Sequence, residues 1–198
     1  MFPFHVNPDL SLELLDLRHA DELFRLTDAN RKHLRAWLPW VDSSQSAEDT
    51  KAFIRQTQKQ LAGDNGFQAA IRHHHTLVGV IGYCGINWAN RSTSLGYWLS
   101  NDAQGRGIMT AACQTFISHA FEVLMLNRVE IRCATENTRS RAIPERLRFA
   151  REGTVRQAEW LYDHYVDHAV YGLLASEWKT GAAPESSRVI TGRVDQPR

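Results

Sequence analysis

A glycine-rich loop between a predicted strand and a predicted helix is the segment of this sequence best suited to chemistry. Gly105 and Gly107 let backbone N–H groups converge on a ligand without interference from a Cβ atom. The helix that begins near Ile108 adds the partial positive charge of a helix N-terminus, and Arg106 adds a full charge at the rim. The pattern therefore predicts a pyrophosphate-binding loop, with a simple turn as the alternative.

Two widespread phosphate-binding motifs do not fit this loop. Dinucleotide-binding loops carry a third glycine at the position that Thr110 occupies here. Nucleotide-hydrolysing loops carry a lysine directly after their last glycine, where this chain has Ile108. The sequence therefore argues against a dinucleotide fold and against P-loop hydrolysis.

The elements that must position the loop follow from apolar spacing and turn residues. Up to the loop, we expect a strand over 10–17, a helix over 20–38 that Pro39 ends, a helix from Ser46 to about 61, and strands over 67–72, 77–86 and 93–99. Beyond the loop, we expect a helix over 108–124, a strand over 129–133, a short helix over about 141–147 and strands within 154–174. This order predicts a mixed α/β fold with a sheet built from hairpins and one parallel crossover.

Composition limits the class of protein. The 198 residues are 43% hydrophobic and 23% charged, with a formal net charge of +1, which is typical of a globular domain and favours neither nucleic-acid nor membrane-surface binding. We expect one domain over 1–178 and a polar tail over 179–198. No apolar run reaches the length of a membrane span, and the N-terminus does not resemble a signal peptide. The three separated cysteines, Cys84, Cys113 and Cys133, indicate a reducing compartment, so a cytoplasmic location is expected.

Histidine clusters and one cysteine are weaker candidates for a metal site or a catalytic nucleophile. The run His73–His75 is typical of an exposed hairpin, because adjacent side chains point in different directions. His164 and His168 would share one strand face, but we predict no metal site there. Cys133 lacks a matched histidine base in the sequence, so a covalent acyl-enzyme is not favoured.

Several segments together resemble the GNAT superfamily of acetyl-CoA-dependent N-acetyltransferases, whose loop reads Gln/Arg-x-x-Gly-x-Gly/Ala. Here that pattern is Gln104, Gly107 and Met109, with Met109 in place of the last small residue. The resemblance covers about residues 8–178 and is to the RimL/RimJ branch, the ribosomal-protein N-terminal acetyltransferases. The matching stretches are His33–Val41, Leu95–Leu99, Gly105–Thr110 and Asn137–Phe149. A further departure is Arg148, which stands where relatives usually have glycine.

The resemblance implies a GNAT-like fold: a mostly antiparallel twisted sheet, flanked by helices, with a V-shaped splay between two parallel central strands. It implies acetyl-CoA as the acetyl donor, no metal, and a possible homodimer. The strand around Trp98–Ser100 would offer a backbone N–H to the thioester carbonyl. The residues expected to bind acetyl-CoA are Trp98, Leu99, Gln104, Gly105, Arg106, Gly107, Ile108, Met109, Thr110 and Asn137.

The resemblance also implies two catalytic residues. Ser140 matches the residue that donates a proton to the departing thiolate, and Glu159 matches the glutamate proposed as general base. Each has a structural alternative: Ser140 and Asn137 can cap the short helix, and Glu159 can be a solvent-facing strand residue. Partial burial between Trp160 and Leu161 would raise the pKa of Glu159, which suits a base.

The acceptor is expected to be an amine that direct attack acetylates in a ternary complex. Deprotonating a lysine costs about 3 kcal/mol more than deprotonating an α-amine at neutral pH, so one moderately perturbed glutamate fits a protein or peptide N-terminus better. A small amine, such as an aminoacyl compound or an antibiotic, is the alternative acceptor, and a non-catalytic acetyl-CoA-binding module is a third reading. The aromatic residues expected to line the acceptor groove, unless they belong to the core, are Trp37, Trp40, Trp160 and Tyr162.

Overall fold

Eight strands form one continuous sheet in the computed structural model, which describes residues 3–180. The sheet order is β1-β2-β3-β4-β5-β6-β8-β7. The strands are β1 (Phe4–Asn7), β2 (Leu10–Leu14), β3 (Gln68–His73), β4 (Thr76–Asn87), β5 (Ser92–Leu99), β6 (Arg128–Ala134), β7 (Ala150–Leu161) and β8 (His164–Leu174). The helices are α1 (Ala20–Ala29), α2 (Arg31–Arg35), α3 (Ala47–Ala62), α4 (Ile108–Ser118), α5 (Thr138–Arg146) and α6 (Ala175–Thr180).

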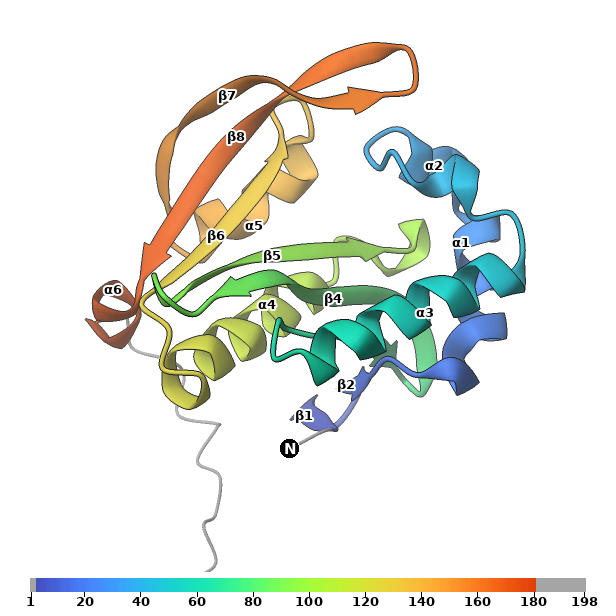
Figure 1. Cartoon of the computed structure of the whole chain (residues 1–198), viewed down its shortest axis with the longest axis horizontal. Coiled ribbons are helices and arrows are strands. Elements are labelled where there is room, and N and C mark those ends of the chain that lie inside the picture. The colour runs from blue at the N-terminus through green and yellow to red at the C-terminus, as the bar shows by residue number, and fades with distance from the viewer. Residues whose placement is uncertain (1–2, 181–198) are drawn as a thin grey trace, which may run out of the picture.

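The sheet opens between its two central strands. All neighbouring strands are antiparallel except β5 and β6, which run parallel and pair only where Ser92–Ser94 face Arg128–Glu130. Beyond these residues the two strands diverge, so that β5 continues with β4 while β6 continues with β8 and β7 (Figure 1). The predicted mixed α/β fold with a V-shaped splay is confirmed.

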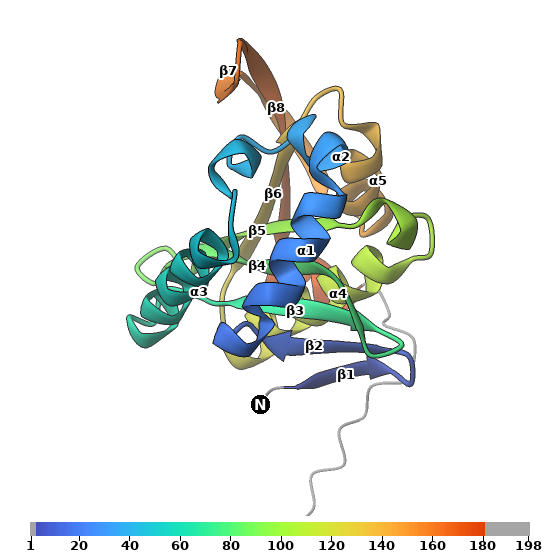
Figure 2. The same ribbon diagram turned by 90° about the vertical axis from the view of Figure 1, so that its right-hand side faces the viewer.

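Helices cover both faces of the sheet. Helix α4 packs on one face, where the main core joins Phe116 and Ile117 to strand residues such as Leu95, Ile131 and Tyr171. Helices α1 and α3 cover the other face of the β1–β5 half, over a smaller cluster that contains Leu23 and Ile54. Figure 2 shows α3 on one side of the strands and α4 and α5 on the other. Both faces of the β1–β5 half are therefore covered by helices.

The prediction of one continuous helix over 20–38 is wrong, because the structure has two helices there, α1 and α2. Asn30 leaves the helical conformation (φ −109°, ψ 9°) and separates α1 from α2. Its side-chain amide donates to the carbonyl oxygen of Leu26, and its side-chain oxygen accepts from the backbone N–H of Asn101. The break therefore ties the α1–α2 corner to the segment that follows β5.

Other boundaries differ for local reasons. The strand expected over 10–17 ends at Leu14, because Asp16 caps a 3-10 turn over Leu17–His19. The helix expected over 108–124 finishes in a π-helical turn, His119–Val123, and β1 was not predicted. The helix expected from Ser46 to about 61 is confirmed as α3, with Ser46 as its N-cap, whose hydroxyl accepts from the backbone N–H of Asp49.

The C-terminal tail expected over 179–198 lies outside the described residues except for its first two positions. Helix α6 continues to Thr180. Within residues 3–180, no helix is long and apolar enough to cross a membrane.

Candidate active site

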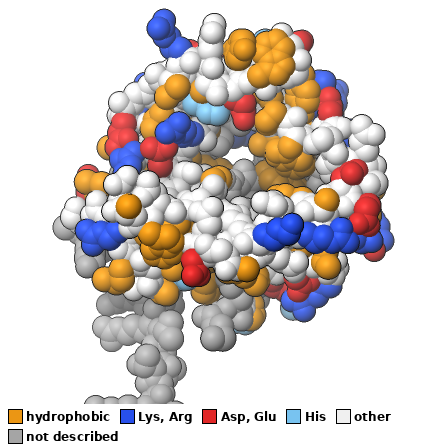
Figure 3. Space-filling view, in the orientation of Figure 1, with side chains coloured by type: hydrophobic (Ala, Val, Ile, Leu, Met, Phe, Trp, Pro, Cys, Tyr) orange, Lys and Arg blue, Asp and Glu red, His pale blue; other side chains and the backbone are white. Residues whose placement is uncertain are grey.

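A cavity of about 1050 Å³ lies at the open end of the V between β5 and β6, and we call it the V cavity. The space-filling view shows this face hollowed between the two halves of the sheet (Figure 3). Segments from α2, β5, the glycine-rich loop, α4 and α5 line the cavity. It brings together these sequence-predicted residues: Trp37, Trp98, Leu99, Gln104, Gly105, Gly107, Ile108, Met109, Thr110, Asn137 and Ser140.

The glycine-rich loop has the backbone that its sequence predicts. Gly105 and Gly107 both lie in the left-handed region, with φ of 74° and 75°, where a side chain is disfavoured. A Cβ atom built on either glycine meets nothing within 4 Å, so a ligand can approach this backbone closely. Gly107 is also the N-cap of α4 and has no side chain to occupy the N–H groups of the first turn. The loop therefore has the space and the polarity to bind an anion.

The predicted loop residues do not all face the cavity in the same way. Ile108 and Met109 are buried in the main core while also lining the cavity, so a long apolar side chain at Met109 is accommodated by packing. Thr110 accepts a 2.8 Å hydrogen bond from Arg146 of α5, which also lines the cavity. Arg106 is exposed and does not line the cavity.

A chain of three polar side chains crosses the rim of the V cavity. Arg139 of α5 donates to Gln104 Oε1 at 2.8 Å, and Gln104 Nε2 lies 2.6 Å from His33 Nε2 of α2. Because the Gln104 oxygen is engaged by Arg139, its amide nitrogen donates to His33, whose Nε2 must then carry a lone pair. Burial, followed by the charge of Arg139, lowers the pKa of His33 and favours this neutral form.

The first turn of α5 presents hydroxyl groups to the cavity. Asn137 is the N-cap of α5, and its side-chain oxygen accepts from the backbone N–H of Ser140 at 3.1 Å. Ser140 lies inside the first turn, so its hydroxyl is not the helix cap. The hydroxyl of Tyr97 donates to the carbonyl oxygen of Ser140 at 3.3 Å, and burial raises the pKa of Tyr97 well above its usual range. Both Tyr97 and Ser140 therefore remain proton donors near neutral pH.

Cys133 lies beside this pair on β6. Burial raises the pKa of its thiol, and a hydrogen bond with the Ser140 side chain partly offsets that rise. A thiol with a raised pKa is a weak nucleophile at neutral pH, because the thiolate is the reactive form.

Acceptor-side aromatic residues lie at different depths. Trp37 lines the V cavity, whereas Trp40 packs against Trp98 with ring centroids 6.1 Å apart. The Tyr162 hydroxyl donates to the carbonyl oxygen of Leu38 at 2.6 Å, and the Arg35 guanidinium lies 3.8 Å over the Tyr162 ring. This contact joins the tip of the β7–β8 hairpin to the segment after α2, and we call it the collar.

Glu159 lies on β7, outside the residues that line the cavity. Its carboxylate is partly exposed, with Oε2 3.4 Å from His168 Nε2 on β8. Trp160 points to the opposite face of the strand, because successive strand residues alternate. There its ring meets that of Tyr165 at 4.8 Å, and Trp160 is 50% exposed. The structure thus separates Glu159 from Trp160.

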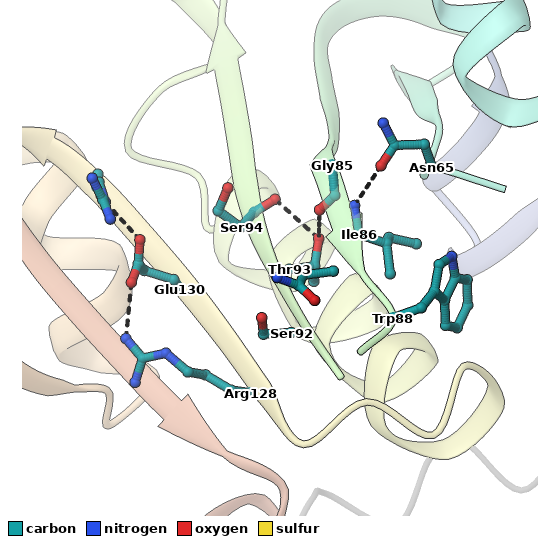
Figure 4. A pocket seen from close by; sticks show the side chains of 11 residues that line it. Asn65, Gly85, Ile86, Trp88, Ser92, Thr93, Ser94, Arg128 and Glu130 are labelled. Atoms are coloured by element: carbon teal, nitrogen blue, oxygen red, sulfur yellow. Dashed lines mark hydrogen bonds and ion pairs between the residues drawn. The ribbon is translucent and has the colours of Figure 1, made fainter. Parts of the chain in front are cut away.

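A second hollow of about 710 Å³ lies at the closed end of the V (Figure 4). Arg128 and Glu130 lie on its β6 wall and pair with each other at 2.9 Å. Arg132 pairs with Glu130 at 2.6 Å, and Arg128 also pairs with Glu152. The charged groups of this hollow therefore neutralise one another.

The polar residues of the V cavity that the sequence did not assign to the site include His33, Tyr97, Arg139 and Arg146. All four lie within stretches that carry the family resemblance. Arg139 contacts Gln104 and Arg146 contacts Thr110, and these partners are distant in sequence, so no local pattern shows the contacts.

Histidine runs show no metal-binding arrangement. His74 and His75 form the β3–β4 turn with φ of 48° and 65°. Across residues 3–180, no group of three or more His, Cys, Asp or Glu side chains is placed to hold a metal ion.

Comparisons with known proteins agree with this geometry. Residues 9–150 match the acetyltransferase (GNAT) domain family. The putative ribosomal N-acetyltransferase YdaF of Bacillus subtilis (strain 168) is 36% identical over 180 residues, covering 90% of this chain and 98% of the relative.

Two solved structures share the fold closely. RimL, a ribosomal L7/L12 alpha-N-protein acetyltransferase in complex with coenzyme A, has a TM-score of 0.84 at 27% identity and covers 87% of this chain and 97% of its own. The microcin C7 self-immunity acetyltransferase MccE, in complex with acetyl-CoA and AMP, has a TM-score of 0.84 at 27% identity. The match covers 87% of this chain and 96% of the MccE chain. With a match over residues 9–150 and relatives that align over nearly their whole length, this chain belongs to the GNAT acetyltransferase family.

Proposed function

We propose that this protein transfers the acetyl group of acetyl-CoA to the N-terminal α-amine of a protein or peptide, by direct attack in a ternary complex. The observation that supports it most is the V cavity, which extends from the anion-binding loop to Trp37 and Leu38 on the acceptor side. Cofactor and acceptor groups thus share one continuous space.

The loop fits the pyrophosphate of acetyl-CoA. It offers an open glycine backbone and an uncapped helix start, and Gln104, Thr110, Arg139 and Arg146 surround it with polar groups. Acetyl-CoA, when bound, supplies the acetyl group as an activated thioester.

The residues of the chain supply the remaining requirements. The edge of β5 that faces β6 has no strand partner beyond Ser94, so its backbone N–H groups can polarise a carbonyl. In this mechanism Glu159 removes the ammonium proton of the acceptor, and Ser140 returns a proton to the leaving thiolate. Tyr97 is placed to assist Ser140, because the two residues contact each other at the cavity wall.

The choice of an α-amine rests on basicity and on the relatives. An α-amine has a pKa near 8, whereas a lysine side chain has one near 10.4, so a single carboxylate deprotonates the former more readily. YdaF and RimL are both named for ribosomal-protein acetylation. A ribosomal-protein-like acceptor, a cytoplasmic location and a homodimer complete this proposal.

A small amine is the second candidate acceptor, favoured by the structural similarity to MccE. The two candidates differ in what must follow the amine: a peptide chain or a small aminoacyl group.

The test is acetylation of a panel with isotope-labelled acetyl-CoA, read by mass spectrometry. The panel pairs each peptide with its N-terminally blocked form, which keeps any internal lysine, and adds small aminoacyl compounds. Labelling of free peptides alone supports the proposal. Labelling confined to the aminoacyl compounds would establish the second candidate, and labelling of blocked peptides would indicate a lysine acceptor.

Two variants test the assigned roles. Glu159→Gln is expected to lower turnover by about 10²–10⁴-fold at neutral pH and to recover partly at high pH, where the amine loses its proton unaided. Ser140→Ala is expected to lower turnover without that recovery. Glu122→Gln, an exposed carboxylate in the π-helical turn, is the matched control. Full activity of Glu159→Gln at neutral pH would show that another group is the base.

A further inference from the structure

We propose that His168 is a positioning residue for Glu159: its imidazole holds one carboxylate oxygen of Glu159 on β7 and leaves the other oxygen for the acceptor amine. The inference rests on the proposed function, in which Glu159 is the base. The proposal follows from a side-chain contact, a strand register and a bulge.

The contact joins two partly buried side chains. Glu159 Oε2 lies 3.4 Å from His168 Nε2, and the side chains are 32% and 17% exposed. The two groups lie at ion-pair distance, and a carboxylate with one oxygen engaged keeps acceptor capacity on the other. His168 therefore restricts a side chain that would otherwise sample several rotamers.

The strand register places both residues on one face. Glu159 pairs with Val166, and His168 lies two residues further along β8, so Glu159 and His168 are diagonal neighbours on the same side. His168 also pairs with Ala134, the last residue of β6, at the edge where β6 leaves β5. The face that carries both side chains thus adjoins the V.

A bulge in β7 creates this register. Val155 pairs with His168 and Glu159 with Val166, so three residues of β7 face the single residue Asp167 of β8. A regular ladder continued from Val155 would place Glu159 opposite His164, two residues nearer the hairpin tip and away from His168.

Asp167 holds the bulge in place. Its side-chain oxygen accepts a 2.7 Å hydrogen bond from the backbone N–H of Gln157, which has a positive φ of 48°. The carbonyl oxygen of Asp167 accepts from the backbone N–H of Thr135, just beyond β6. The bulge that brings Glu159 to His168 is thereby tied to the end of β6.

The neighbours of His168 include one charged partner in direct contact. Ala134 and Val155, which pair with His168, carry no charge, and the Asp167 side chain on the same strand is bonded to Gln157. Arg132 lies on the same face of β6, two residues before Ala134, and pairs with Glu130. Glu159 is the charged partner that the structure places against the ring.

The experiment compares His168→Leu, His168→Gln and the control His164→Leu in the full-length protein, with the acceptor found in the panel. His164 lies on the same strand and bonds to Asp163, not to Glu159. We expect His168→Leu to lower kcat by about 10- to 100-fold, with an unchanged CoA-dependent shift in Tm. His168→Gln keeps an N–H donor that can contact the same carboxylate oxygen, so it is expected to retain most of kcat.

The outcomes separate this inference from the proposed base. Wild-type kcat in both His168 variants, or equal losses of kcat in His168→Leu and His168→Gln, with an inactive Glu159→Gln, would overturn the positioning role and leave Glu159 as base. Full activity of Glu159→Gln would overturn both. If His168→Leu unfolds, His168→Ala, which also lacks a donor, takes its place in the comparison.

Discussion

The hydroxyl group of Tyr162 donates a 2.6 Å hydrogen bond to the carbonyl oxygen of Leu38, a residue 124 positions earlier in the chain. Burial raises the pKa of Tyr162, so the phenol remains a donor near neutral pH. The contact joins the β7–β8 hairpin to the segment after α2, two elements that face each other in Figure 1, and Leu38 itself lines the V cavity.

Removing this hydroxyl is expected to weaken acceptor binding. A neutral hydrogen bond contributes about 0.5–1.5 kcal/mol, so Tyr162→Phe is expected to raise the acceptor KM by roughly 2- to 10-fold. The loop proposed to bind acetyl-CoA lies on other elements, so the KM for acetyl-CoA is expected to stay unchanged. Steady-state kinetics with each substrate varied in turn measures both values.

Tyr165→Phe is the matched control, because Tyr165 lies on the same hairpin and is 57% exposed. Equal acceptor KM values for the two variants would show that the collar does not take part in acceptor binding.

The loop makes a prediction about ligand-dependent stability. CoA at about 100 times its Kd is expected to stabilise the native protein by about 2.7 kcal/mol, an increase in Tm of about 5–11 °C for a chain of this size. Gly107→Val places a branched side chain where φ is 75° and where the backbone faces the V cavity, so this variant is expected to lose the CoA-dependent shift. Each variant is compared with its own ligand-free Tm by thermal scanning.

Gly153→Val is the control, since a Cβ atom at Gly153 also meets nothing within 4 Å but no left-handed backbone is required there. A CoA shift in Gly107→Val equal to that of wild type would remove the loop from the cofactor site.

Local sequence signals predicted most helices and strands, because apolar spacing and capping within a few residues determine these elements. The run from Ile108 to Ser118 is helical by its own apolar spacing, and Ser46 caps α3 through Asp49 three residues away. The contacts that complete the site join distant segments instead. Gln104 meets His33 across 71 positions, and the break at Asn30 depends on Asn101, also 71 positions away. Such partners are set by the sheet order, which no local pattern specifies.

The bulge in β7 is a second feature that the local sequence does not specify. The residues from Val155 to Glu159 contain no glycine, so no sequence signal marks the extra residues opposite Asp167. The family resemblance identified Glu159, but only the register shows which neighbour holds its carboxylate.

Arg148 was singled out in the sequence as a departure from glycine, and the structure explains the preference. Its φ is 62°, in the left-handed region directly after the C-cap of α5. This conformation costs a residue with a Cβ atom about 1–2 kcal/mol in the folded state. Glycine avoids this cost but raises the conformational entropy of the unfolded chain, which offsets part of the gain in stability. Arg148→Gly is therefore expected to stabilise the protein by about 0.5–1 kcal/mol, or about 1–4 °C in Tm.

Arg148→Ala separates backbone strain from loss of the side chain. It removes the guanidinium but keeps the Cβ atom, so its Tm is expected to stay near that of wild type. If alanine and glycine raise Tm equally, the side chain and not the left-handed backbone is the source of the effect.

The polar chain from Arg139 through Gln104 to His33 predicts a specific pH dependence of stability. His33 must accept the Gln104 N–H, so the native state favours the neutral imidazole and its pKa is lowered. In the unfolded chain a histidine takes up a proton near pH 6.5. Between that pH and the lowered native pKa, the unfolded state binds more protons, so the free energy of unfolding falls as pH falls. The stabilising effect of neutral His33 is fully present above about pH 6.5 and is lost as pH drops through the native pKa.

His33→Gln isolates this effect, because the glutamine oxygen accepts from Gln104 but does not titrate. The difference in unfolding free energy between wild type and His33→Gln, measured by denaturant titration from pH 8 to pH 5, is expected to be constant above about pH 6.5 and to shift against wild type below it. Burial also lowers the pKa of His119. Both proteins contain His119, so its contribution cancels in this difference. His75→Gln, in the β3–β4 turn, is the control and is expected to follow wild type at every pH. Parallel curves for wild type and His33→Gln would show that Gln104 turns its oxygen to a protonated His33 and releases Arg139.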